Sequence, residues 1–262
     1  MQFYFFILGL FIGSFLGVVI DRLPYNKSIL IGRSQCNSCR HKLGLLDLIP
    51  VLSFILLKGK CRYCKAKLSL FYPVIELLTA FLFALIFFNI VTPLTLVNLK
   101  FIFYLLYLLL MVSSFIVIFF IDLKNGIIPD KILIFDTVIS LVWLSISPLS
   151  IIINRLLSGF GSIAFFIAVS YIFYLVTKKE GMGGGDVKMS FVLGLFLGFP
   201  AIVFSLYLAF ILGTIFAIFL LIFRKKTFKG SLPFGPFLIM GTLLSLFFQN
   251  QLYAFLLKFI QF

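Results

Sequence analysis

Two aspartates stand at the ends of apolar runs, where a charged side chain is costly. Asp122 follows the run 101–121 in FFIDLKNGIIPDKI, and Asp186 stands just before the run 188–223 in GMGGGDVKMS. An acid at the end of a membrane helix usually has a function or a partner. Two neighbouring carboxylates share a proton, so that one can act as general base toward water while the other protonates the carbonyl oxygen or the leaving amine. The pair predicts aspartyl protease chemistry, which needs no metal.

Three glycines directly precede the second aspartate: Gly183, Gly184 and Gly185. Because they lack side chains, they can adopt positive φ and allow an extended substrate backbone to come close. They also destabilise a helix at this position, which packing alone does not explain. The alternative is a flexible connection in which Asp186 only caps the next helix. The second carboxylate favours the catalytic interpretation.

All four cysteines of the chain lie in the loop 21–70, as two C-x-x-C pairs: Cys36, Cys39, Cys61 and Cys64. Four thiolates predict a closed, tetrahedral structural zinc site without an open coordination position. Disulfides are the alternative, but they are disfavoured if the loop faces the reducing cytoplasm. A redox C-x-x-C would need a surrounding βαβ pattern, which is missing. His41, the only histidine, is expected at the surface because four cysteine ligands already suffice.

The composition indicates the elements that must position these residues. The chain has 262 residues, of which 63% are hydrophobic, and a mean hydropathy of +1.23. Soluble domains are about 45–50% apolar, so the solvent of this fold is lipid. The net charge of +14 does not favour a nucleic-acid partner, because membrane topology itself demands positive loops. Residues 3–20 lack a basic segment before them and a cleavage site after them, which predicts a retained first helix.

The apolar runs long enough to span a membrane are 3–20, 71–90, 101–121, 131–147, 157–176, 188–223 and 234–257. The run 188–223 is too long for one span, and Gly198 and Pro200 predict a break in it. The loop 21–70 holds ten Lys and Arg residues and is therefore expected to be cytoplasmic. If 188–223 crosses the membrane twice, the next basic loop is also cytoplasmic, like 21–70. That loop contains Arg224, Lys225, Lys226 and Lys229. The predicted fold is an all-α polytopic membrane protein with about eight transmembrane helices and both termini outside.

Three parts follow from this topology. Residues 1–20 form the first transmembrane helix, 21–70 a cytoplasmic zinc-binding loop between helices 1 and 2, and 71–262 a transmembrane aspartyl protease bundle. Both aspartates then lie at the cytoplasmic membrane edge. Glu76 lies about one turn inside the second apolar run, so we expect it to have a polar partner.

Several stretches resemble one known family. GMGGGDVK resembles the G-x-G-D motif of intramembrane aspartyl proteases, and together with IDLKNGIIPD it resembles bacterial type IV prepilin leader peptidases. GSFLGVVIDRLP (13–24), the cysteine loop with the second apolar run, and LPFGPFL (232–238) are similar to further signatures of that family, in the same order. The resemblance implies a multi-pass protein of the bacterial inner membrane with a catalytic pair at Asp122 and Asp186. It also implies zinc at the four cysteines.

The activity implied by the resemblance is cleavage of the basic leader of type IV prepilins or pseudopilins, which serve pili, secretion or competence. The cut follows a glycine at the cytoplasmic membrane face. Many members also methylate the new amino terminus with S-adenosylmethionine. The family usually has Asn where this chain has Gly17, in the region associated with methyl transfer. The sequence leaves open which filament system is served and which oligomeric state the protein adopts.

Two other functions must be distinguished from this one. An intramembrane aspartyl protease of the presenilin or signal-peptide-peptidase type has its first catalytic Asp in a Tyr-Asp context and lacks a zinc loop. Here Ile121 precedes Asp122, and the four cysteines are present. A non-enzymatic zinc-ribbon membrane assembly factor would tolerate Asp122→Ala, whereas a protease would not.

Overall fold

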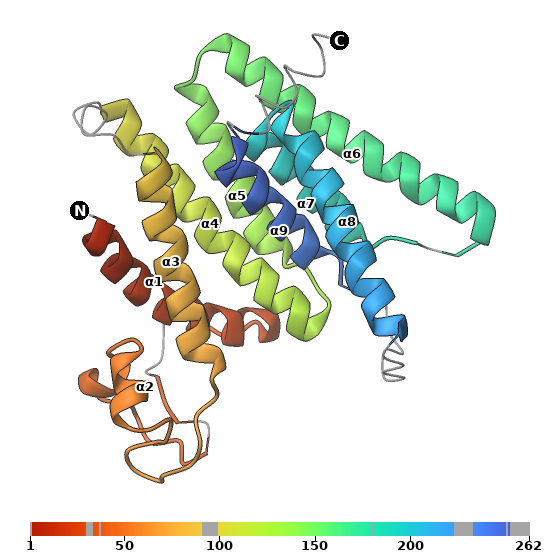
Figure 1. The fold of residues 1–262 in the computed structure, drawn as a ribbon. Helices are drawn as coiled ribbons and strands as arrows, with labels where there is room; N and C mark the ends of the chain where they lie inside the picture. The colour runs from red at the N-terminus through yellow and green to blue at the C-terminus, as the bar shows by residue number, and fades with distance from the viewer. Residues whose placement is uncertain are drawn as a thin grey trace. The chain divides into compact units, whose positions relative to one another are not determined.

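A computed structural model describes residues 2–29, 34–36, 38–90, 99–179, 181–222, 233–249 and 251 of the chain. The helices are α1 (Gln2–Arg22), η1 (Leu23–Tyr25), η2 (Leu45–Leu48), α2 (Leu52–Leu56), α3 (Phe71–Ile90), α4 (Leu99–Asn125), α5 (Asp130–Ser145), α6 (Leu149–Thr177), α7 (Gly184–Leu197), α8 (Ala201–Ile222) and α9 (Gly235–Phe247) (Figure 1). The chain divides into two compact units, Met1–Val117 and Ile118–Phe262. The division falls within α4, and each unit is described by itself.

The predicted all-helical membrane fold is confirmed. Five described helices are long and apolar enough to cross a bilayer: Gln2–Tyr25, Phe71–Asn89, Leu99–Asn125, Leu149–Thr177 and Ala201–Ile222. The predicted break at Gly198 and Pro200 is also present, because α7 ends at Leu197 and α8 begins at Ala201. The basic loop that begins at Arg224 lies outside the described residues, so the count of eight spans stays a prediction.

In the first unit, α1 and α3 pack against each other through small residues. A Cβ atom on Gly9 would lie 2.5 Å from the Cα atom of Ala80, and a Cβ atom on Gly13 would lie 2.7 Å from the Cα atom of Glu76. Residues four apart share one helix face, and glycines on that face let two membrane helices approach closely. A larger side chain at either glycine would force α1 and α3 apart.

The same two helices are joined by a polar contact where α1 ends and α3 begins. The Tyr72 hydroxyl donates a hydrogen bond of 2.6 Å to Oδ2 of Asp21. The Tyr72 ring lies beside Gly17, where an added Cβ atom would be 3.3 Å from the ring. Tyrosines of this kind are typical of the membrane–water interface, with the ring in the apolar region and the hydroxyl in the polar one.

In the second unit, α6 fixes the position of α7. A Cβ atom on Gly194 would lie 2.6 Å from the Cα atom of Gly159, so the two helices touch through their backbones. Beyond the end of α7, Gly198 has a φ of +73°. The side chain of Asn154 then bonds to both backbone polar groups of Phe199. The Phe199 N–H donates to Oδ1 of Asn154 at 2.8 Å, and Nδ2 of Asn154 donates to the Phe199 carbonyl at 3.1 Å. These contacts fix the end of α7 that is remote from Asp186.

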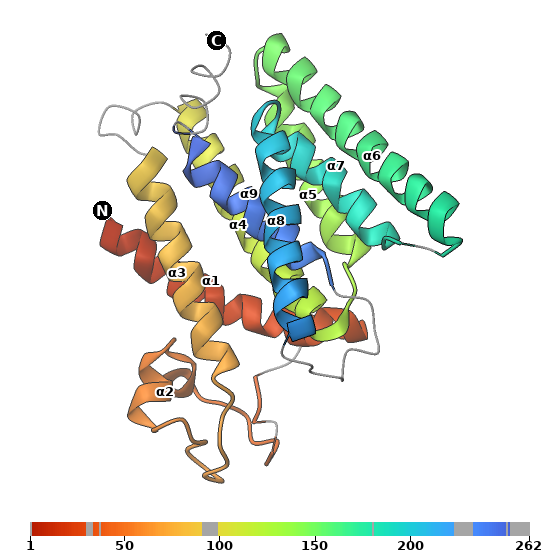
Figure 2. The ribbon, with the colours of Figure 1, turned by 45° about the vertical axis from the view of Figure 1, so that its right-hand side comes forward.

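The last described helix, α9, lies beside α8 (Figure 2), and small and polar residues join the two. A Cβ atom on Gly241 would collide with the carbonyl oxygen of Ser205. The hydroxyls of Ser205 and Thr242 lie 2.9 Å apart, and the Ser245 hydroxyl donates to the Ala201 carbonyl at 2.7 Å. Together these contacts set the register of α9 and therefore the place of its first residue.

Candidate active site and metal centre

Asp122 lies in the last turn of α4 and is only 4% exposed. Its Oδ2 atom has no hydrogen-bond partner among the residues that the structure describes. Buried polar atoms are nearly always bonded, and each exception needs an explanation. A carboxylate oxygen kept free of partners inside a membrane protein is a candidate for chemistry rather than for structure.

Asp186 lies in the first turn of α7, where it bonds to the start of its own helix. Its N–H donates to the Gly183 carbonyl at 3.1 Å. Gly183 is the residue at the helix cap, and no side-chain hydrogen bond caps α7. The geometry around Ile128 relates this position to Asp122: a Cβ atom on Gly185, the neighbour of Asp186, would lie 3.1 Å from Cβ of Ile128, and Ile128 also lies beside Gly235, which contacts Asp122.

The three glycines before Asp186 have different surroundings. A Cβ atom on Gly184 would meet nothing within 4 Å, and one on Gly183 would meet only Oδ2 of Asp186, at 3.2 Å. A Cβ atom on Gly185 would lie 3.1 Å from Cβ of Ile128. Gly184 is therefore open to an approaching substrate backbone, whereas the absence of a side chain at Gly185 leaves room for Ile128.

Gly235, the first residue of α9, completes the site from a third helix, and no role was predicted for it from the sequence. A Cβ atom here would lie 2.5 Å from Oδ2 of Asp122 and 3.3 Å from Cδ1 of Ile128. The glycine is directly followed by Pro236, and proline is favoured in the first turn of a helix. That signal predicts a helix start in LPFGPFL, but not what the helix start touches.

A solvent-exposed ion pair joins the elements beside the site. Nζ of Lys188 lies 2.9 Å from Oδ1 of Asp130, and both side chains are 62% exposed. Asp130 is the first residue of α5, where a negative charge interacts favourably with the helix dipole. Exposed pairs of this kind contribute little to stability, so this acid differs from the buried Asp122 and the half-buried Asp186.

An apolar groove of about 640 Å³ lies elsewhere in the second unit, between α6 and α8. Asn154, Ser158 and Tyr207 are among its few polar neighbours, and its lining contains neither aspartate. Size and apolar lining alone would make it a default ligand site. The carboxylates that could do chemistry lie outside it, so we do not assign it to the catalytic centre.

The four cysteines form one cluster in the first unit: the Sγ atoms of Cys36, Cys39, Cys61 and Cys64 all lie within 4.8 Å of one another. The sulfurs of Cys36 and Cys64 are 3.8 Å apart, and four Zn–S bonds of ~2.3 Å in a tetrahedron separate the sulfurs by ~3.8 Å. The backbone N–H groups of Cys39 and Ser38 lower the pKa of Cys36 to about 6, which favours the thiolate that a metal requires. The predicted Cys₄ cluster is confirmed, and its geometry fits a zinc ion.

The two halves of the cluster repeat the same turn. The Arg40 N–H donates to the Cys36 carbonyl at 2.9 Å, and the Lys65 N–H donates to the Cys61 carbonyl at 3.0 Å. Arg40 and Lys65 both have positive φ, at 57° and 58°. The sequence pattern C-x-x-C-[R/K]-x-K occurs in both halves, so one local conformation places each pair of sulfurs.

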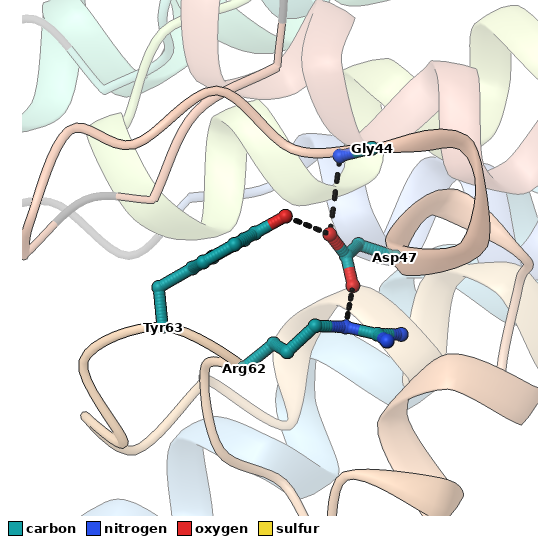
Figure 3. A network of polar contacts seen from close by, with 4 residues as sticks. All are labelled: Gly44, Asp47, Arg62 and Tyr63. Atoms are coloured by element: carbon teal, nitrogen blue, oxygen red, sulfur yellow. Dashed lines mark hydrogen bonds and ion pairs between the residues drawn. The ribbon is translucent and has the colours of Figure 1, made fainter.

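Asp47 lies between the two cysteine turns and binds residues of the second turn, 61–64 (Figure 3). It accepts hydrogen bonds from Nε of Arg62 at 2.7 Å, from the Gly44 N–H at 3.1 Å and from the Tyr63 hydroxyl at 3.4 Å. Burial raises the pKa of Asp47, but the Gly44 N–H and the Arg62 guanidinium lower it by more, so that it lies below its usual value. His41 is exposed, as predicted, with its ring 3.6 Å from that of Tyr63.

Comparison with known proteins identifies the family of the chain. Residues 7–90 match the bacterial peptidase A24 N-terminal domain, and residues 109–218 match the type IV leader peptidase family. No solved structure matches the chain significantly.

Three relatives carry the name prepilin leader peptidase/N-methyltransferase. The protein of Aeromonas salmonicida is 32% identical over 94% of this chain and 90% of its own length. That of Bacillus subtilis is 30% identical, covering 97% of this chain and 96% of the relative. That of Pseudomonas aeruginosa is 29% identical, covering 97% and 92%. With matches that extend over both units and nearly the whole length of each relative, the chain belongs to the type IV leader peptidase family.

Proposed function

We propose that the chain is a membrane-embedded aspartyl endopeptidase that removes the basic leader from type IV prepilins or pseudopilins. The cut follows a glycine at the cytoplasmic membrane face. One observation supports the proposal most directly: Ile128, just after the end of α4, contacts both Gly185, the neighbour of Asp186, and Gly235, which lies against Asp122. The name shared by the relatives supports the same substrate class.

The pair of carboxylates can hydrolyse a peptide bond with one shared proton. The ionised carboxylate takes a proton from water, and the hydroxide adds to the carbonyl carbon of the scissile bond. The protonated carboxyl gives its proton to the carbonyl oxygen. When the tetrahedral intermediate collapses, the C–N bond breaks, the carboxyl that took the proton from water gives it to the leaving amine, and the other carboxylate takes a proton back from a hydroxyl of the intermediate. The products are a leader with a new carboxylate and a mature chain with a free amine.

The arrangement in the membrane is part of the proposal. Eight spans, with 1–20 as the first, 21–70 as a cytoplasmic zinc loop and 71–262 as the protease bundle, place the most basic loop inside. Both aspartates then lie at the cytoplasmic edge. A basic leader stays in the cytoplasm while the apolar segment behind it enters the bilayer, so the bond between them reaches this edge.

The proposal includes a second activity, methylation of the new amino terminus, because the relatives' name includes it. S-adenosylmethionine would supply the methyl group to that amine. Within the described residues there is no glycine-rich turn between a strand and a helix that would hold such a donor, so no step of methyl transfer is derived from the geometry. At Gly17, the Asn usual in the family would require the Tyr72 ring to move, since a Cβ atom lies 3.3 Å from it.

Incubation of the purified enzyme with a prepilin tests both activities. Mass spectrometry of the product is expected to show a cut after the leader's glycine, and a further methyl group only when S-adenosylmethionine is present. A protease of the presenilin type would instead cut within the apolar segment. A non-enzymatic assembly factor would leave the precursor intact, and either result would refute the proposal.

We further propose that the cysteine cluster holds one structural zinc per chain, because four thiolates leave no open coordination position. Cys61→Ser is expected to lower the zinc content strongly and to loosen the loop between α1 and α3. Any loss of cleavage should be indirect and smaller than that caused by a change in the aspartate pair. Elemental analysis of purified protein together with a cleavage assay measures both effects.

Ser38→Ala is the control, since it changes a side chain between Cys36 and Cys39, in the other turn of the cluster, without removing a sulfur ligand. It is expected to keep the wild-type zinc content. Native protein that contains no metal and has its cysteines paired in disulfides would contradict the zinc assignment.

A further inference from the structure

The segment between the two cysteine turns exposes large apolar side chains. These lie on η2 and α2, with exposed fractions of 88% for Leu45, 65% for Leu46, 57% for Leu52, 63% for Ile55 and 77% for Leu56. We call residues 45–57 the apolar bridge. A cluster of this kind on an otherwise basic loop normally marks a surface that contacts protein or membrane.

A hydrogen bond to α3 fixes the level of the apolar bridge along that helix. The Val51 N–H, at the start of α2, donates to Oε2 of Glu76 at 2.8 Å. Glu76 lies five residues beyond Phe71, the first residue of α3, which corresponds to ~7.5 Å along the helix axis. Because α3 is a membrane-capable helix, the start of α2 lies level with its second turn. The expected polar partner of Glu76 is thus a backbone group of this bridge.

The backbone at this point is strained. Val51 has a φ of +58°, which a β-branched residue rarely adopts. The Leu52 N–H donates to the Pro50 carbonyl at 2.5 Å, which closes a γ-turn of the rare kind with positive φ at its centre. Such turns persist only where their surroundings hold them. The bond to Glu76 does so and keeps α2 beside α3.

The charges around the apolar bridge identify what it faces. Lys42 precedes it, and Lys58 and Lys60 follow it. Asp47 is the only acid in 22–70, and it is paired with Arg62. Apolar side chains flanked by lysines are typical of segments that lie in the bilayer interface, with the lysines beside lipid phosphates. Both ends of the loop are also tied to membrane helices, α1 and α3.

We propose that the apolar bridge lies in the membrane interface, with its exposed leucines and isoleucine among the outer parts of the acyl chains. The two cysteine turns stand before and after it, so a metal bound between them closes the base of a hairpin that dips into the lipid. The proposal depends on α1 and α3 spanning the membrane and not on the protease assignment, so it can fail without affecting that assignment.

Single tryptophans placed in the full chain test the proposal. Trp143 is the only tryptophan, so Trp143→Phe gives a silent background. Into it we would introduce Leu56→Trp on the bridge and, as the control, Ser38→Trp at an exposed position of the first cysteine turn. In liposomes with brominated acyl chains, the Leu56→Trp emission is expected to be quenched several-fold more than that of Ser38→Trp. Acrylamide in the water should give the opposite order.

Zinc content equal to that of the wild type shows that each variant has folded, and Leu45→Trp replaces Leu56→Trp if the latter has not. Equal quenching of bridge and control by acrylamide would show that the bridge faces water and would overturn the proposal. Protection of the bridge from both quenchers would overturn it as well, because protein and not lipid would then cover the surface.

Discussion

Replacing either Asp122 or Asp186 by asparagine is expected to abolish leader cleavage while leaving the protein folded in the membrane. Asparagine keeps the size of the side chain but cannot take or give the shared proton, so the remaining carboxylate cannot activate water and protonate the product alone. Removing one member of a catalytic unit commonly lowers the rate by several orders of magnitude. Single-turnover cleavage of a prepilin by each purified variant measures this loss.

Asp130→Asn is the matched control, because Asp130 is a neighbouring acid that is exposed and engaged with Lys188. Its loss removes only a surface pair, which contributes little, and near wild-type cleavage is expected. Cleavage at the wild-type rate by Asp122→Asn or by Asp186→Asn would show that the pair is not the catalytic unit.

Gly235→Ala is expected to reduce the turnover number by ~10²-fold or more, although only one methyl group is added. The new Cβ atom would lie 2.5 Å from Oδ2 of Asp122, so the carboxylate would have to turn away from its partner. A displacement of ~1 Å at reacting groups is sufficient for such a loss. Steady-state kinetics should show the effect in the turnover number more than in KM, since the added methyl group displaces the carboxylate.

Gly161→Ala provides the comparison, because a Cβ atom at this position of α6 meets nothing within 4 Å. It should cleave like the wild type, and both variants should keep wild-type thermal stability to within a few degrees. Undiminished turnover by Gly235→Ala would mean that α9 does not lie against Asp122 in the working enzyme.

The features that could be predicted from the sequence are those encoded locally. Each C-x-x-C turn is determined by a few consecutive residues, so the spacing of Cys36, Cys39, Cys61 and Cys64 was enough to predict the cluster. The break before α8 follows from Gly198 and Pro200 in the same way. Long apolar runs predict helices because a membrane requires every backbone group to be bonded within its own segment.

The features that could not be predicted depend on packing between segments far apart in the chain. Gly235 reaches Asp122 only because Gly241 and Thr242 fix the register of α9 on α8. Ile128 fills the space beside Gly185 for a similar reason. A polar partner was expected for Glu76, but its identity depends on a strained turn that no local pattern indicates. Of the predicted run 234–257, residues 250 and 252–257 lie outside the described part of the chain.

The length of α7 has a consequence for the lipid around the enzyme. Its 14 residues measure ~21 Å, whereas the hydrocarbon core of a bilayer is ~30 Å thick. In the eight-span arrangement proposed above, a helix that starts at the cytoplasmic edge with Asp186 ends before it reaches the other side. The Asn154 amide bonds to both polar groups of the Phe199 backbone at this end. A bilayer that thins beside α7 is one way to accommodate so short a helix. Lipids with longer chains increase the mismatch, so we expect the activity to depend on membrane thickness.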